Sequence, residues 1–131
     1  MAPDAPPFTL GLEEEYLLVD KATRAVTEDA PEALFEECEK RLKGRVAHEF
    51  LSSQIEVSTG VCADIGQARA ELAELRTTIA EVANGFGLAP IAASTHPFSL
   101  WESQHHTDRE RYNEIARDIQ APVRRLMICG M

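Results

Sequence analysis

Long apolar runs, clustered positive charge and paired cysteines are all missing from this sequence of 131 residues. No apolar stretch approaches the roughly 20 residues that a membrane-spanning helix needs, which argues against a membrane partner. The 13 Lys and Arg are outnumbered by 22 Asp and Glu, and the net charge of −9 argues against binding a nucleic-acid backbone. A nucleotide is still an acceptable ligand if a divalent cation lies between the carboxylates and the phosphates.

The cysteines Cys38, Cys62 and Cys129 form no CxxC pair and are odd in number. This pattern favours free, buried thiols in a reducing cytoplasm over a disulfide framework. The Pro-rich start lacks the basic residues and the apolar region of a secretory signal, and we predict that residues 1–7 are disordered. The balance of 44% hydrophobic and 27% charged residues predicts one folded unit over residues 8–131.

Segments with the two-residue period of strands alternate along the chain with segments of helical period, which predicts a mixed α/β or α+β domain. Asp64 and Gln67 have the spacing of a helix capping box, and the apolar residues after them step along one helix face by threes and fours. Asp29 and Glu32 have the same spacing. The predicted strands cover 8–20, 46–59, 88–93 and the run from Leu126 to Cys129, and the predicted helices begin near residues 29, 64 and 109.

Three consecutive glutamates, Glu13, Glu14 and Glu15, lie in the first predicted strand. Because side chains alternate along a strand, Glu13 and Glu15 share one face, whereas Glu14 shares the other face with apolar residues. Two carboxylates at this spacing repel each other unless a cation lies between them, and oxygen ligands of this kind suit Mg²⁺. A solvated acidic surface is the alternative, although such a surface seldom lies in the middle of an apolar strand.

The predicted strand over 46–59 carries a further carboxylate, Glu56, on the same face as Gln54. Glu56 would meet Glu13 and Glu15 if the two strands are neighbours in the sheet. A half-exposed strand with its polar face in water is the simpler alternative.

Five segments, taken in order, resemble the carboxylate–amine ligases, the family that contains the bacterial and plant type of glutamate–cysteine ligase. The segments are G-L-E-E-E-Y (11–16), S-Q-I-E-V-S-T-G (53–60), A-S-T-H-P-F (93–98), R-E-R-Y (109–112) and L-M-I-C-G-M (126–131). The resemblance implies an α+β fold, part of a glutamine-synthetase-like catalytic domain in which a curved, mostly antiparallel sheet has helices packed on its outer face. It also implies that ATP phosphorylates a glutamate-type carboxylate and that an amine such as cysteine attacks the acyl phosphate to form an amide.

The resemblance also implies which residues form the site. Glu13, Glu15 and Glu56 match the metal-binding carboxylates of the family, with Mg²⁺ as the cation and ATP as a substrate. The candidates for substrate binding are Gln54, His96, Arg109 and Arg111, and no residue is assigned as catalytic.

Two of these candidates open a predicted helix, where the helix dipole disfavours cations. We therefore expect Arg109 or Arg111 to bind an anion such as a substrate carboxylate. Salt bridges to neighbouring acidic residues are the alternative for both arginines. For His96 the alternative is a loop histidine held in place by Pro97.

Members of the family continue past the I-C-G-M segment into a His-x-His strand, so the resemblance identifies this chain as an N-terminal portion of a ligase. We expect the chain alone to be inactive and its apolar residues 126–129 to be exposed, so that it forms a homo-oligomer or needs a partner that completes the sheet. The alternatives are a non-catalytic binding domain on the ligase scaffold, one part of a split enzyme, or a cation site without ATP chemistry.

Overall fold

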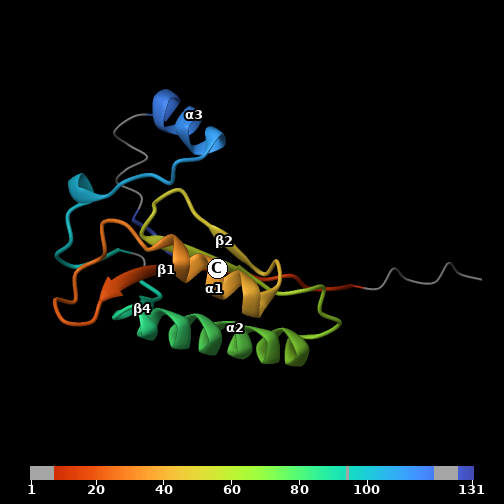
Figure 1. Cartoon of the computed structure of the whole chain (residues 1–131). Helices are drawn as coiled ribbons and strands as arrows, with labels where there is room; N and C mark the ends of the chain where they lie inside the picture. Colours follow the sequence, from red (N-terminus) through yellow and green to blue (C-terminus); the bar gives the residue numbers. More distant parts are fainter. Residues whose placement is uncertain (1–7, 94, 120–126) are drawn as a thin grey trace, which may run out of the picture.

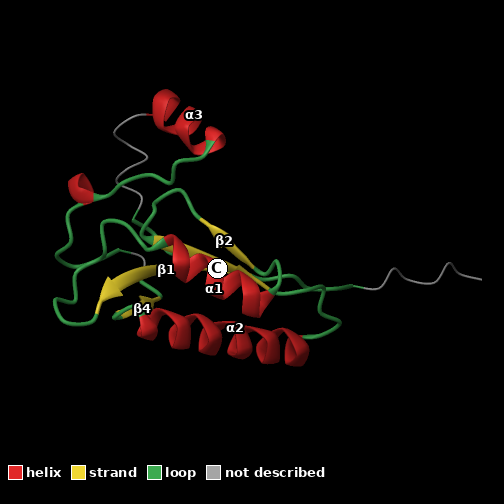
Figure 2. Cartoon of the chain, in the orientation of Figure 1, coloured by secondary structure: helices red, strands yellow, loops and turns green. Residues whose placement is uncertain are grey.

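A four-stranded antiparallel sheet, with strand order β2-β3-β1-β4, forms the centre of the described structure. The computed structural model describes residues 8–93, 95–119 and 127–131, and the fold is α+β, as the sequence predicts (Figures 1 and 2). In chain order the described elements are β1 (Glu13–Asp20), α1 (Glu32–Leu42), β2 (Val46–His48), β3 (Gln54–Ser58), α2 (Ile65–Gly85), β4 (Leu88–Ile91), a 3₁₀ turn (Trp101–Ser103) and α3 (Glu110–Ile119).

Helices α1 and α2 lie alongside each other on one face of the sheet (Figure 1). The apolar faces of both helices meet alternate residues of the strands, including Tyr16 and Leu18 of β1 and Ile55 and Val57 of β3. Burial of this cluster holds the sheet and the two helices together, because removal of apolar surface from water is the main stabilising contribution to folding.

The predicted start of α2 is confirmed. The Asp64 side chain accepts a hydrogen bond of 2.9 Å from the backbone N–H of Gln67, and Gln67 Oε1 accepts one of 2.9 Å from the N–H of Ala63. The periodic residues after the cap face the sheet, and Leu72, Leu75 and Ile79 are buried.

The predicted cap of α1 is wrong. Pro31 occupies the N-cap position, and no side chain caps the helix there. Asp29 instead accepts a hydrogen bond of 2.7 Å from Ser52 Oγ and lies 2.7 Å from His105 Nδ1. The spacing of Asp29 and Glu32 suited a cap, but tertiary partners take the Asp29 carboxylate.

The single strand predicted over 46–59 is also wrong, because this segment is a hairpin of β2 and β3. The chain turns between the two strands, where the backbone N–H of Gln54 bonds to the carbonyl of Leu51. The turn contains neither Gly nor Pro. Burial of Phe50 and Leu51 fixes it instead.

The other face of the sheet is covered in part by α3 and by residues 127–131. Met127 is buried in a second apolar cluster on this face of the sheet. Tyr112 of α3 packs against that cluster. A buried strand was predicted from Leu126 to Cys129; Leu126 lies outside the described residues, and 127–129 are not a strand. The predicted exposure of this segment holds for Ile128, which is 46% exposed, but not for Met127, which is 4% exposed.

Residues 1–7, predicted to be disordered, also lie outside the described residues. Among the helices that the structure describes, none combines the length and the apolar character needed to cross a membrane.

Replacement of the α2 cap provides a test of this helix start. We expect Asp64→Ala to lower the free energy of unfolding by about 1 kcal/mol, because the N–H of Gln67 loses its acceptor. Asp64→Asn keeps an acceptor oxygen and should cost much less. Urea unfolding followed by circular dichroism measures both, and equal losses would contradict this account of the cap.

Candidate active site

The register of β1 and β3 brings two of the predicted metal ligands face to face. Glu15 is the direct partner of Glu56, and Glu13 is the partner of Ser58. Directly paired residues of antiparallel strands point to the same side of the sheet, with their Cβ atoms about 4.5–5.5 Å apart. Glu15 and Glu56 therefore project together from the face opposite α1 and α2.

A third carboxylate, Glu49, joins this pair. Ligand oxygens of Glu15, Glu49 and Glu56 all lie within 4.8 Å of one another, and each residue is half-buried. Glu49 follows β2 directly, two residues after Ala47, which is the partner of Glu56. We call this group the carboxylate cluster.

Glu49 was not predicted as part of the site, because the pattern of residues 46–59 is that of one continuous strand. In a continuous strand, residues 49 and 56 are an odd number of positions apart and point to opposite faces. The hairpin reverses the chain and brings both side chains to the same face. The signal that could have found Glu49 is the pair of serines, Ser52 and Ser53, which are common in turns.

Burial and mutual repulsion raise the pKa of two members of the carboxylate cluster, Glu49 and Glu56. Burial raises the pKa of Glu56, and the negative charges of Glu49, Glu13 and Glu15 raise it further. Burial also raises the pKa of Glu49, and the charge of Glu15 adds to this effect. The charge of Arg111 favours the ionised form of both residues but does not offset the other effects.

Glu13 lies at the rim of the site. It is exposed, and it is not a member of the carboxylate cluster, although its charge contributes to the raised pKa of Glu49 and Glu56. The structure thus brings together Glu15 and Glu56 of the predicted set and adds Glu49. The assignment of metal-binding roles to Glu13, Glu15 and Glu56 stays a prediction.

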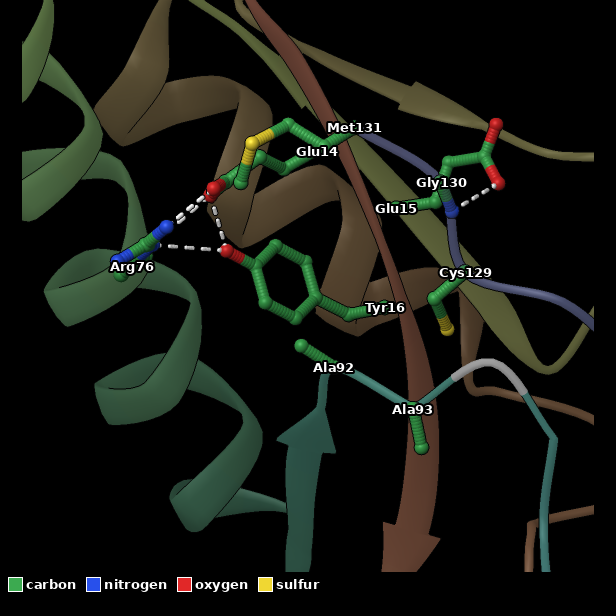
Figure 3. Close-up of a pocket in the computed structure, with 9 residues that line it drawn as sticks. All are labelled: Glu14, Glu15, Tyr16, Arg76, Ala92, Ala93, Cys129, Gly130 and Met131. Carbon is green, nitrogen blue, oxygen red and sulfur yellow. Dashed lines mark hydrogen bonds and ion pairs between the residues drawn. The ribbon is translucent and has the colours of Figure 1, made fainter.

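The segment 127–131 packs against the carboxylate cluster. Gln54 is buried, and its Nε2 donates a hydrogen bond of 2.7 Å to the carbonyl of Ile128. The N–H of Gly130 donates one of 3.0 Å to Glu15 Oε2 (Figure 3). Gln54 therefore orients this segment, and Gly130 orients one of the cluster carboxylates.

Arg111, another predicted substrate-binding residue, also lies beside the carboxylate cluster. It lines a cavity of about 310 Å³ together with Glu15, Glu49, Gln54 and Tyr112. The hydroxyl of Tyr112 donates a hydrogen bond of 2.9 Å to the carbonyl of His48, which fixes α3 beside the end of β2. A guanidinium and two carboxylates of the carboxylate cluster, Glu15 and Glu49, therefore border one open cavity.

The other two substrate-binding candidates lie elsewhere. His96 is buried, its Nε2 is 2.9 Å from the carbonyl of Arg24, and its Nδ1 accepts from the N–H of Ser99 at 3.0 Å. These contacts hold the His96 ring in its loop. Arg109 is exposed and lines a different hollow with Glu32 and His48. Substrate binding by His96 and Arg109 stays a prediction.

Comparison with known proteins decides the family. The family model described as "Glutamate-cysteine ligase family 2" matches residues 9–131. This chain belongs to glutamate–cysteine ligase family 2.

Individual members of glutamate–cysteine ligase family 2 agree with this result. A protein of Jannaschia sp. (strain CCS1) is 58% identical over 123 residues, which cover 94% of this chain and 32% of that protein. One of Rhodospirillum rubrum is 54% identical over 130 residues, covering 96% of this chain and 33% of that protein. Both carry the name "Putative glutamate--cysteine ligase 2". The chain thus spans about a third of the length of these relatives.

The raised pKa of Glu56 gives a testable effect on stability. In the absence of divalent cations, we expect Glu56→Gln to raise the thermal unfolding midpoint at pH 7 by a few degrees. A carboxylate whose folded pKa is raised destabilises the folded chain above that pKa. This cost disappears as the pH falls through the raised folded pKa towards the usual value of 4.5.

The gain from Glu56→Gln should therefore shrink on acidification from pH 7 to about pH 4.5. Calorimetry at several pH values measures it. Glu36→Gln, an exposed position on α1, is the matched control and should show no such gain. A loss of stability in Glu56→Gln at pH 7 would contradict the repulsion described above.

Proposed function

We propose that this chain forms the N-terminal part of the catalytic domain of an ATP-dependent carboxylate–amine ligase that joins a glutamate-type carboxylate to an amine such as cysteine. Family membership and the names of the relatives support the ligase class. The carboxylate cluster is the observation that supports the ATP-dependent reaction. Phosphoryl transfer depends on positioning and on compensation of phosphate charge, and this face of the sheet has groups suited to both.

The residues present fit a hard divalent cation such as Mg²⁺. The carboxylate cluster supplies only oxygen ligands, and few of them, which leaves room for water and phosphate oxygens in an octahedral shell. Burial, and after it the charge of neighbouring glutamates, raises the pKa of Glu49 and Glu56, and a cation would offset that negative charge. When bound, Mg²⁺ would neutralise charge on the phosphates of ATP.

The chain's own residues would then act as follows. Glu15, Glu49 and Glu56 hold the cation, and Glu13 at the rim is the additional ligand that the family resemblance implies. Arg111 carries its charge into the same cavity and could hold the substrate carboxylate through two hydrogen bonds. The remaining candidates for substrate contacts are Gln54, His96 and Arg109.

A family-length protein that contains this chain provides the test of catalysis. We expect release of ADP from Mg²⁺-ATP only when L-glutamate and an amine such as L-cysteine are both present. Glu56→Gln and Glu49→Gln should each lower the rate at least about 100-fold, because ligands of a catalytic cation are removed. Glu36→Gln should leave the rate unchanged. ADP release that needs no amine would contradict the proposal.

The 131-residue chain itself should be inactive. The active site of a ligase needs groups for ATP and for both substrates, and the relatives are about three times as long as this chain. We therefore expect no ADP release from the chain alone above the level of the Glu56→Gln variant. Substrate-dependent turnover by the chain alone would show that these residues suffice.

The alternatives have distinct outcomes in the same experiments. Binding of Mn²⁺ that is unaffected by ATP would indicate a cation site without ATP chemistry. A family-length protein that binds ATP without releasing ADP, whatever amine is supplied, would indicate a binding domain on the ligase scaffold. Activity that appears only after a second polypeptide is added would indicate a split enzyme.

A further inference from the structure

The glutamate between the two candidate ligands of β1 has a different environment. Glu14 is only 3% exposed, and its carboxylate points away from Glu15, toward α2 (Figure 3). Arg76 of α2 donates to both carboxylate oxygens, through Nη2 to Oε1 and through Nε to Oε2 at 2.8 Å. The hydroxyl of Tyr16 donates to the same carboxylate, and Arg76 Nε donates to that hydroxyl oxygen at 3.1 Å.

Glu14 and Arg76 form an ion pair, and the Tyr16 hydroxyl bonds to both of them. The hydrogen bonds from Arg76 hold the pKa of Glu14 below its usual value despite burial. Burial and the neighbouring Glu14 raise the pKa of Tyr16 to about 12. Glu14 is thus ionised and Tyr16 is a neutral donor at neutral pH, so the contact between strand and helix is charged and two-pronged.

This contact lies where β1 has least support from the rest of the sheet. Strand β4 pairs with β1 only from Leu17 to Asp20, so the half of the strand with the glutamates extends beyond it. On that side, the backbone N–H of Glu15 bonds to the carbonyl of Gly130 in the segment 127–131. The half of β1 that carries the candidate ligands is therefore paired along one side with β3 and is not covered by β4 on the other.

Helix α2 is a rigid point of attachment for this half-strand. Leu72, Leu75 and Ile79, on either side of Arg76 in sequence, are buried in the apolar cluster. An ion pair from this helix to Glu14 restricts the twist and the position of β1 between Glu13 and Glu15. Because successive side chains of a strand point to opposite faces of the same backbone, holding Glu14 on one face also positions Glu13 and Glu15 on the other.

We propose that Glu14 and Arg76 are positioning residues, which hold the Glu13–Glu15 half of β1 so that the carboxylate cluster keeps its cation-binding geometry. This inference rests on the proposed function, because it takes the carboxylate cluster to be a cation site. Neither residue contacts the cation. Their effect is transmitted through the backbone of β1.

The variant Arg76→Met distinguishes two ways in which Arg76 can act on cation binding, through its positive charge or by anchoring β1. Removing a positive charge should strengthen cation binding if Arg76 acts on the site only through its field. Removing the anchor should weaken binding, and losses of about tenfold are typical when a residue that orients a ligand is replaced. Glu14→Gln is less informative. It removes a negative charge near the cation and also removes the partner of Arg76, and each of these changes should weaken cation binding.

The experiment is a titration of the 131-residue chain with Mn²⁺, followed by electron paramagnetic resonance, well below the unfolding temperature of each variant. We expect about tenfold weaker binding for Arg76→Met and a smaller loss, about threefold, for Arg76→Lys, which keeps the charge but not the two-pronged contact. Arg69→Met, which removes an exposed arginine from the same helix, is the matched control and should not weaken binding.

The outcomes distinguish this inference from the proposed function. Unchanged or tighter binding in Arg76→Met, with loss of binding in Glu56→Gln, would overturn the positioning role and leave the cation site intact. No Mn²⁺ binding by the unaltered chain would overturn the positioning role together with the cation site on these residues, and the ADP-release test on the family-length protein would still decide the proposed ligase reaction. If Arg76→Met does not fold, Arg76→Lys decides, and binding equal to that of the unaltered chain would overturn the positioning role.

Discussion

Repulsion among neighbouring carboxylates is the destabilising interaction that the rest of this structure has to offset. Glu15 lies on β1, Glu56 on β3 and Glu49 directly after β2, and their oxygens lie within 4.8 Å of one another. Like charges at this distance destabilise the folded chain in water, and more so where the site is half-buried. The apolar cluster between the sheet and helices α1 and α2 supplies the stability that keeps the three strands in register against this repulsion.

The two faces of the sheet therefore differ in what they contribute. One face is apolar, packs against α1 and α2, and includes the ion pair between Glu14 and Arg76. The other face carries the carboxylate cluster, next to a smaller apolar cluster that contains Leu17, Phe50 and Met127. Strict alternation along β1 produces this division, since adjacent residues of the strand lie in different environments.

Elements with local determinants could be predicted from sequence. The start of α2 follows from Asp64 and Gln67, and the paired faces of Glu15 and Glu56 follow from alternation once the strands are neighbours. The hairpin of β2 and β3 could not be predicted in this way, because its turn is set by burial of Phe50 and Leu51 and not by Gly or Pro. Missing the hairpin also meant missing Glu49. The role of Asp29 depended on Ser52 and His105, which are remote in sequence.

The contact between Glu14 and Arg76 has a consequence for the register of β1. A shift of the strand by two residues preserves alternation, and it would place Glu13 opposite Glu56 with a carboxylate still on the correct face. Hydrophobic patterning alone opposes such a shift only weakly. The same shift would move Leu12 to the position opposite the Arg76 guanidinium and leave Glu14 without its partner. The middle glutamate of E-E-E thus distinguishes two registers that the outer glutamates cannot tell apart.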